Sequence, residues 1–281
     1  MKDRHVIEAL GNAKVTIEDS KVVNVEEPDI DYCPIFNKYH NIKEITKDEI
    51  KNNIEFRIKK FGMCTKDRQI KLDDMLSVGI SEILKTNTEM GIIDVVVGAC
   101  EGVGTLLMTD PDIIQGVGGR VSALISTTPI DEVIEKVGRQ NVIDPENATL
   151  NPIEGIKKAV QLGYKNIAVT ILPSPLIKQI RQMQLPDDVK IYILVAHTTS
   201  APEELIKDAF KYADIISSCA SKYVRLYAQK NKSYYYGNNV PMYAISEDGR
   251  TLLDNRLRKT NKKLSINDYP QDQSNIPHPL K

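Results

Sequence analysis

The alternation of hydrophobic and polar positions predicts short strands at the start of the chain. In HVIEALGNAKVTIEDSKVVNVEE, Val15 and Ile17 alternate with polar residues, and valines recur after Asp19 and Ser20. Aspartate and serine are favoured in turns because their side chains bond the nearby backbone. The pattern predicts a small β-hairpin within residues 1–45.

The next two apolar patterns have the period of a helix. In TKDEIKNNIEFRIKKFG, Thr46 and Glu49 form a capping box, isoleucines recur every fourth position, and Gly62 ends the run. The segment DDMLSVGISEILKTNTEMG has its apolar residues on one face and stops at Gly91. We expect a helical segment over residues 46–91.

From residue 92 onward, apolar strands alternate with amphipathic helices. IIDVVVGA, NIAVTIL, KIYILVA and DIIS are short apolar runs typical of buried parallel strands, and capped helical patterns separate them. This order predicts right-handed βαβ units, and hence an α/β fold with a mostly parallel, Rossmann-like sheet and flanking helices. In VPMYAISEDGRTLLDNRL, Asp248 and Gly249 predict the turn of a C-terminal antiparallel hairpin that closes the α/β core of residues 92–258.

The last part of the chain is polar and contains prolines. We expect residues 259–281 to form an extended or disordered tail, or an arm that wraps a partner. The sequence shows no internal repeat with the period of a solenoid.

Composition narrows the class of protein. With 37 basic and 38 acidic residues among 281, no overall charge points to nucleic acid. The N-terminus MKDRHVIEAL lacks an apolar signal core, and no apolar run reaches transmembrane length, so we expect a cytoplasmic protein without membrane association. In a reducing compartment the four cysteines are thiols, ligands or catalysts and not disulfides.

Three predicted strands end at soft or titratable residues. One ends at Cys100, with Glu101 beside it, and others end at His197 and at Cys219. Because open α/β sheets bind ligands beyond the carboxyl ends of their strands, we expect these residues to share one site. The alternative is packing, since free cysteine is among the most buried residue types.

The other two thiols lie in predicted turns, where ligands and reactive groups often lie. Convergent thiolates suit an iron–sulfur cluster or a soft metal, although Tyr32 and Phe36 make packing as good an account of Cys33. No C-x-x-C pair occurs, so zinc-ribbon, thioredoxin and ferredoxin patterns are excluded. The candidate metal ligands are Cys33, Cys64, Cys100, Cys219 and His197, with Glu101 as a supporting carboxylate.

A catalytic interpretation uses the same residues differently. Cys100 would be a nucleophile, His197 its general base, and the amides of EGVGT would donate to an oxyanion. His197 could equally be a hydrogen-bonded histidine at the start of a helix.

Two glycine clusters, CEGVGT and QGVGGR, could present backbone amides to an anion. Tight turns, or a flexible lid over the Cys100 site, are the alternatives. Neither cluster fits the dinucleotide fingerprint or the P-loop, so no nucleotide is expected. The candidate anion-binding residues are Gly102, Gly104, Gly116, Gly118, Gly119 and Arg120.

Several long segments together resemble the methanogenesis marker protein 8 family, an archaeal group known by a domain of unknown function. They are YCPIFNKY, NIEFRIKKFGMCT, ISEIL, ACEGVGT, QGVGGRVSALISTTPI, HTT and CASKYVR, and they contain all four cysteines. The resemblance implies participation in methane formation. It points to methyl-coenzyme M reductase, whose nickel tetrapyrrole must be made, inserted and reductively activated by iron–sulfur machinery.

Three hypotheses follow. The first is an accessory protein with a thiolate-ligated metal or iron–sulfur cluster that serves assembly or activation of that reductase. The second is a non-catalytic scaffold subunit of a methanogenic complex, whose tail binds a partner. The third is a cysteine-dependent enzyme with Cys100 as nucleophile. Whether the chain forms a homo-oligomer is left open.

Overall fold

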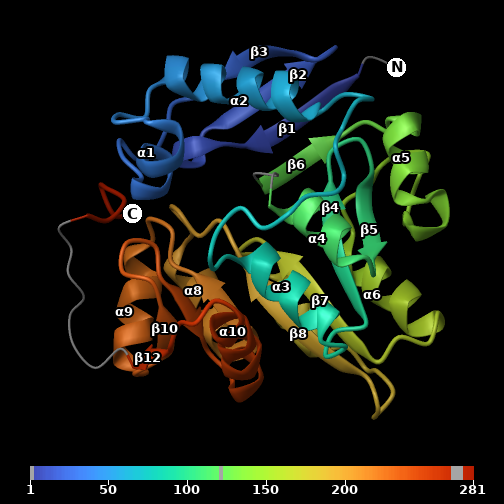
Figure 1. The fold of residues 1–281 in the computed structure, drawn as a ribbon, viewed down its shortest axis with the longest axis vertical. Helices are drawn as coiled ribbons and strands as arrows, with labels where there is room; N and C mark the ends of the chain where they lie inside the picture. Colours follow the sequence, from blue (N-terminus) through green and yellow to red (C-terminus); the bar gives the residue numbers. More distant parts are fainter. Residues whose placement is uncertain (1–2, 120–122, 267–274) are drawn as a thin grey trace.

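The chain folds into two β-sheets surrounded by helices. The computed structural model in Figure 1 describes residues 3–119, 123–266 and 275–281. These ranges contain ten α-helices, so the fold is mixed α/β. No helix within them has the length and apolar character needed to cross a membrane.

The smaller sheet is antiparallel and contains the predicted hairpin. Its turn lies at Asp19 and Ser20, with φ of 48° and 63°, which matches the right-handed twist of the flanking strands. The sheet is completed by one strand from more than a hundred residues further along the chain. Its strands in spatial order are β3 (Lys21–Val25), β2 (Lys14–Glu18), β1 (Arg4–Glu8) and β6 (Ala123–Thr127).

Two helices belong to the same unit, α1 (Pro34–His40) and α2 (Lys47–Phe61). Figure 1 shows α2 lying across the small sheet, with which its isoleucines share one apolar core. The predicted capping box is confirmed, because the Thr46 hydroxyl accepts a hydrogen bond from the Glu49 amide. Gly62 ends α2 in the left-handed conformation, with φ of 67°.

The larger sheet has eight strands and is mixed, which corrects the expectation of a mostly parallel sheet. Only the central β9, β8, β7 and β4 run parallel. A tight turn after β4 and a second turn after β10 reverse the chain and add antiparallel neighbours. The spatial order is β12 (Ser265–Ile266), β10 (Tyr234–Tyr236), β11 (Met242–Ala244), β9 (Ile215–Ser217), β8 (Lys190–Val195), β7 (Asn166–Ile171), β4 (Val95–Cys100) and β5 (Gly104–Met108).

Helices cover both faces of this sheet, because its strands alternate apolar residues toward two separate cores. One core contains α3 (Ile80–Glu89), α4 (Pro111–Gly118), α5 (Asp131–Val137) and α10 (Glu247–Lys259). The other contains α6 (Pro152–Gln161), α7 (Leu176–Arg181), α8 (Glu203–Tyr212) and α9 (Lys222–Lys230).

Two local predictions need correction. The expected C-terminal hairpin at Asp248 and Gly249 is the first turn of α10, whose start is capped by the Ser246 hydroxyl accepting from the Gly249 amide. The antiparallel hairpin of this region is β10–β11 instead. The helix expected from residue 73 begins only at Ile80, because the preceding segment bonds a side chain of α3 and not its own backbone.

Part of the predicted tail contacts the chain itself. Its first residues include β12, and residues 267–274 lie outside the described ranges. Further on, His278 pairs with Tyr32 as an isolated bridge, and their rings stack with centroids 5.0 Å apart. The Lys281 amide donates to the Ala220 carbonyl at 2.9 Å. These contacts join the small-sheet unit to the loop after β9.

Candidate functional site: a cavity at the ends of the parallel strands

A cavity of about 430 Å³ lies between the carboxyl ends of the parallel strands and the small-sheet unit. Strands β4, β7, β8 and β9 all reach it, and α1, α2 and residues 75–82 form the opposite walls. This is the position at which open α/β sheets bind ligands. Most of its lining is aliphatic or aromatic, including Phe36, Phe61, Leu84, Val96 and Met108.

His197 and Cys219 both line this cavity, each just beyond the end of its strand. Their φ angles are 55° and 40°, in the left-handed region that non-glycine residues adopt at a cost. The buried Thr198 hydroxyl lies 2.8 Å from the Ser217 carbonyl and 2.9 Å from the Ser218 carbonyl, and donates to them. This contact ties together the two loops that carry His197 and Cys219.

Arg57 of α2 supplies a positive charge to the cavity. Burial, and after it the positive charge of Arg57, lower the pKa of His197 to about 4. Burial and the same charge also lower the pKa of His40 at the end of α1. Both imidazoles are therefore neutral at pH 7. Among the described lining residues, the Arg57 guanidinium accompanies two neutral rings, an arrangement suited to an anionic group.

Cys33 lies close to Cys219. It precedes α1 and is half-buried; burial raises the pKa of its thiol, and the proximity of Cys219 raises it further. The Cys219 sulfur is 3.5 Å from the Ser217 hydroxyl. Cys219 and two imidazoles therefore line the cavity, and Cys33 lies near Cys219.

Cys64 and Cys100 form a separate, fully buried group with Glu101 and Arg68. The Arg68 Nε donates to the Glu101 carboxylate at 2.6 Å, and the side chains are 1% and 0% exposed. The Cys100 sulfur lies 3.6 Å from the other carboxylate oxygen. Burial, and then the negative charge of Glu101, raise the pKa of both thiols, so both are protonated at neutral pH.

The structure thus divides the predicted ligand set in two. Among the described residues, no three His, Cys, Asp or Glu side chains are placed to hold a metal ion. The four cysteines lie in two separate pairs, an arrangement that does not fit a cluster held by four thiolates. Near Cys100, two of the predicted oxyanion donors already have acceptors, because the Gly102 amide donates to the Thr127 hydroxyl and the Val103 amide to the Cys100 carbonyl.

The comparisons with known proteins cover nearly the whole of this architecture. The family described as "Uncharacterized protein conserved in archaea (DUF2099)" matches residues 5–258, a range that contains both sheets apart from the first residue of β1 and the short β12. The chain belongs to this family. "Uncharacterized protein MJ0054" of Methanocaldococcus jannaschii is 40% identical over 282 residues, covering 99% of each chain. The narrower resemblance to methanogenesis marker protein 8 stays a prediction.

The glycine clusters of this DUF2099 chain have mainly structural surroundings. Gly102 and Gly104 form the turn between β4 and β5, with φ of 78° and 73°. A Cβ on Gly104 would lie 2.3 Å from the Ala148 carbonyl, so only glycine fits there. Gly118 and Gly119 line the cavity, whereas Arg120 lies outside the described residues. An anion-binding role for this second cluster stays a prediction.

Sequence reasoning passed over Arg57 and the segment before α3, two of the main features of this site. Arg57 follows Ile54 by three residues and precedes Phe61 by four, so it lies beside the apolar stripe of its helix. That cation at the edge of an apolar face was the available signal. For the segment before α3 the sequence offered none, because its contacts come from distant residues.

Proposed function

We propose that the protein binds a small organic molecule with an apolar body and an anionic group. The observation that carries this proposal is the cavity of about 430 Å³, lined mainly by apolar side chains and lying at the carboxyl ends of four parallel strands. Its size falls in the range of about 300–1,000 Å³ that holds small-molecule ligands, and such sites combine apolar walls with a few polar groups.

The charges of the lining support an anionic group on the ligand. Glu82 is the one acidic side chain among the described lining residues, and backbone amides of Met75 and Leu76 already donate to it. Arg57 adds a positive charge next to the neutral His197. An anion near the end of β8 would therefore meet a favourable potential in apolar surroundings, where charge–charge attraction is strong.

Two naphthalene dyes of similar shape test the proposal. Anilinonaphthalene sulfonate carries one negative charge, and N-phenyl-1-naphthylamine is neutral. We expect each to bind the folded protein with a stoichiometry of one. Arg57→Met should raise the dissociation constant of the anionic dye about 10- to 100-fold, which corresponds to the loss of one charge-assisted hydrogen bond. The dissociation constant of the neutral dye should change less than about 2-fold. Lys60→Met, on the exposed side of the same helix, is the matched control.

A second substitution locates the dyes. Ala196 lines the cavity just after β8, so Ala196→Leu fills part of the space and should abolish binding of both dyes. A circular dichroism spectrum and melting temperature like those of the wild type show that the variant is folded. Binding of both dyes unchanged in Ala196→Leu and in Arg57→Met would refute the proposal, as would the lack of saturable binding.

The metal and reductase roles expected from the sequence stay separate proposals. The location of Cys219 and His197 at one cavity, with Cys33 near Cys219, supports a thiol-dependent role there. Anaerobic purification from a native-like host, with analysis of iron, sulfide, zinc and nickel, tests it. Stoichiometric metal that Cys219→Ala loses would support a thiolate-ligated metal or cluster at this cavity. Folded, metal-free protein would count against it.

A further inference from the structure

The segment before α3 forms part of the cavity wall. Met75, Leu76, Val78 and Gly79 line the cavity, and Met75 is also 43% exposed. The segment therefore contacts the space where the ligand would lie, and Met75 within it is also accessible to solvent. The segment itself has no regular secondary structure.

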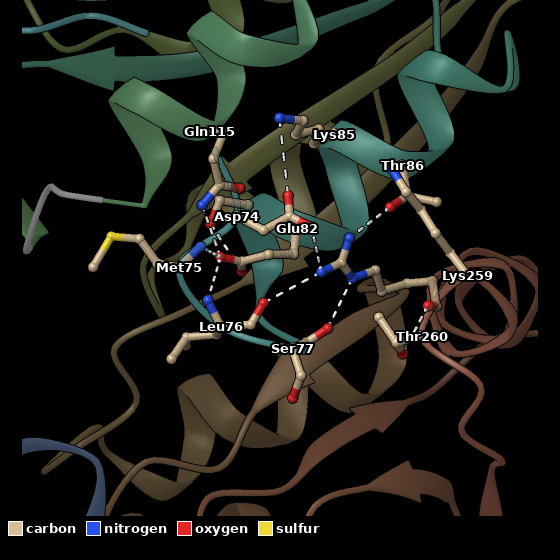
Figure 2. A network of polar contacts seen from close by, with 12 residues as sticks. Asp74, Met75, Leu76, Ser77, Glu82, Lys85, Thr86, Gln115, Lys259 and Thr260 are labelled. Carbon is tan, nitrogen blue, oxygen red and sulfur yellow. Dashed lines mark hydrogen bonds and ion pairs between the residues drawn. The ribbon is translucent and has the colours of Figure 1, made fainter. Parts of the chain in front are cut away.

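The buried carboxylate of Glu82 holds this segment from one side. Figure 2 shows the amides of Met75 and Leu76 directed at one carboxylate oxygen, at 3.2 and 3.0 Å. The Gln115 side-chain amide donates to the same oxygen at 2.7 Å. A Cβ on Gly79 would lie 2.5 Å from the other oxygen, so glycine allows the carboxylate to reach the segment.

Arg256 of α10 holds the same segment from the other side. Its buried guanidinium donates to the Leu76 and Ser77 carbonyls at 3.2 and 2.8 Å and to the Thr86 hydroxyl at 3.1 Å. It also pairs with Asp74 at 2.8 Å. Four consecutive residues, 74–77, are therefore held mostly by polar contacts to two side chains.

We infer that residues 74–79 are a gate over the cavity and that Met75 determines which molecules pass it. Glu82 and Arg256 are positioning residues that hold the gate closed. Because the contacts share two anchors, weakening one anchor loosens the whole segment, while the apolar cores beneath keep their packing. The flexible thioether of Met75 adapts to molecules of different shape, and a smaller residue there would admit bulkier ones. That a ligand passes this gate rests on the proposed function, but the opening of the gate can be measured without a ligand.

Cys219 reports the opening, because it lines the cavity behind the gate. The rate at which N-ethylmaleimide modifies Cys219 would be followed by peptide mass spectrometry. We expect Asp74→Asn to raise the rate about 3- to 10-fold and Met75→Ala about 10-fold. Glu89→Gln is the matched control, since Glu89 also joins α3 to α10 through an ion pair, with Lys259, but lies at the far end of α3.

Size selection separates a gate from a merely structural contact. With N-methyl-, N-cyclohexyl- and N-phenylmaleimide, the rate of Cys219 labelling in the wild type should fall as the reagent becomes larger. In Met75→Ala, the ratio of the rates with the smallest and the largest reagent should be at least 3-fold smaller than in the wild type. Rates for Cys219 that equal the wild-type rates in both gate variants would overturn the inference. An equal increase in the labelling rates of Cys64 and Cys100 would also overturn the inference, because it would indicate general unfolding.

The outcomes also separate this inference from the proposed function. If wild-type protein binds neither dye but Cys219 labelling depends on the gate variants, the ligand proposal fails and the gate stands. If the dyes bind and the labelling ignores the gate variants, the gate fails alone.

Discussion

Cys100 is the last residue of one strand of the parallel core and Cys219 follows another, yet they lie in opposite environments. After β4 the chain reverses at once into β5, and this hairpin packs beneath α5 with Cys100 fully buried. After β9 the chain continues into α9, and Cys219 lines the cavity. The strand end alone therefore does not determine whether a side chain can meet a ligand. The path of the chain in the next few residues decides it.

The largest expected contrast is in thiol reactivity. Cys64 and Cys100 can be modified only when the core opens, whereas Cys219 faces a cavity. With a typical opening free energy above about 5 kcal/mol, they should react at least about 1,000-fold more slowly than Cys219. Pulsed labelling with N-ethylmaleimide, read by peptide mass spectrometry, measures each rate. Labelling of Cys100 within 10-fold of Cys219 would contradict the separation of the two groups.

The buried ion pair of Arg68 and Glu101, which lies beside Cys100, should have a large effect on the free energy of unfolding. Arg68→Met leaves the Glu101 carboxylate buried without its partner, at a cost of about 3–5 kcal/mol in the free energy of unfolding. Removing both charges, as Arg68→Met with Glu101→Leu, should recover most of this loss. Urea denaturation measures both values.

A surface arginine provides the control for this measurement. Arg139 has three acidic partners but is 41% exposed, so Arg139→Met should cost less than about 1 kcal/mol. If the Arg68 and Arg139 variants lose similar stability, the buried pair does not organise its group as the structure indicates.

His197 should make the stability of the protein sensitive to acid. Folded His197 stays neutral down to its pKa of about 4, whereas the unfolded chain binds a proton below about pH 6.5. The unfolded state therefore binds more protons between pH 6.5 and 4, and stability falls as the pH is lowered through this window. The full shift corresponds to up to about 3 kcal/mol, since one pKa unit is about 1.4 kcal/mol.

Comparison with His197→Gln isolates this effect. The variant should lose less stability than the wild type between pH 6.5 and 4. Glu8 acts in the opposite direction, because burial raises its pKa to about 7 and its contribution is lost as the pH rises from about 4.5 to 7. It is present in both proteins, so the difference between their urea midpoints reports His197. Equal pH profiles would show that folded His197 does not have the lowered pKa described here.

Sequence patterns predicted the parts of the molecule that depend on neighbours along the chain. The Asp19–Ser20 turn and the Thr46 cap are set by contacts within a few residues, and the position of His197 and Cys219 follows from a general rule for strand ends. The Asp248–Gly249 error has the same origin, because this pair also fits the first turn of a helix capped by a preceding serine.

The remaining features depend on residues far apart in sequence. Strand β6 completes the small sheet, Arg256 of α10 holds a segment before α3, and Arg68 pairs with Glu101. A single side chain in the sequence carries no mark of such a partner. For the same reason, four cysteines could be recognised as candidates, but their division into two groups could not be seen.

The smallest predicted effect on the free energy of unfolding concerns the hydrogen bond that links the loops carrying His197 and Cys219. Thr198→Val removes the hydroxyl that donates to the Ser217 and Ser218 carbonyls, and should cost about 1–2 kcal/mol. Since that bond fixes the loop carrying Cys219, the labelling rate of Cys219 should change several-fold while Cys64 stays protected. Thr251→Val is the control, because its hydroxyl bonds only the Glu247 carbonyl on an exposed helix face, where loss should cost less than about 0.5 kcal/mol. If the Thr198 variant alters Cys64 and Cys219 together, the bond supports the whole fold and the two thiol groups are less independent than their positions imply.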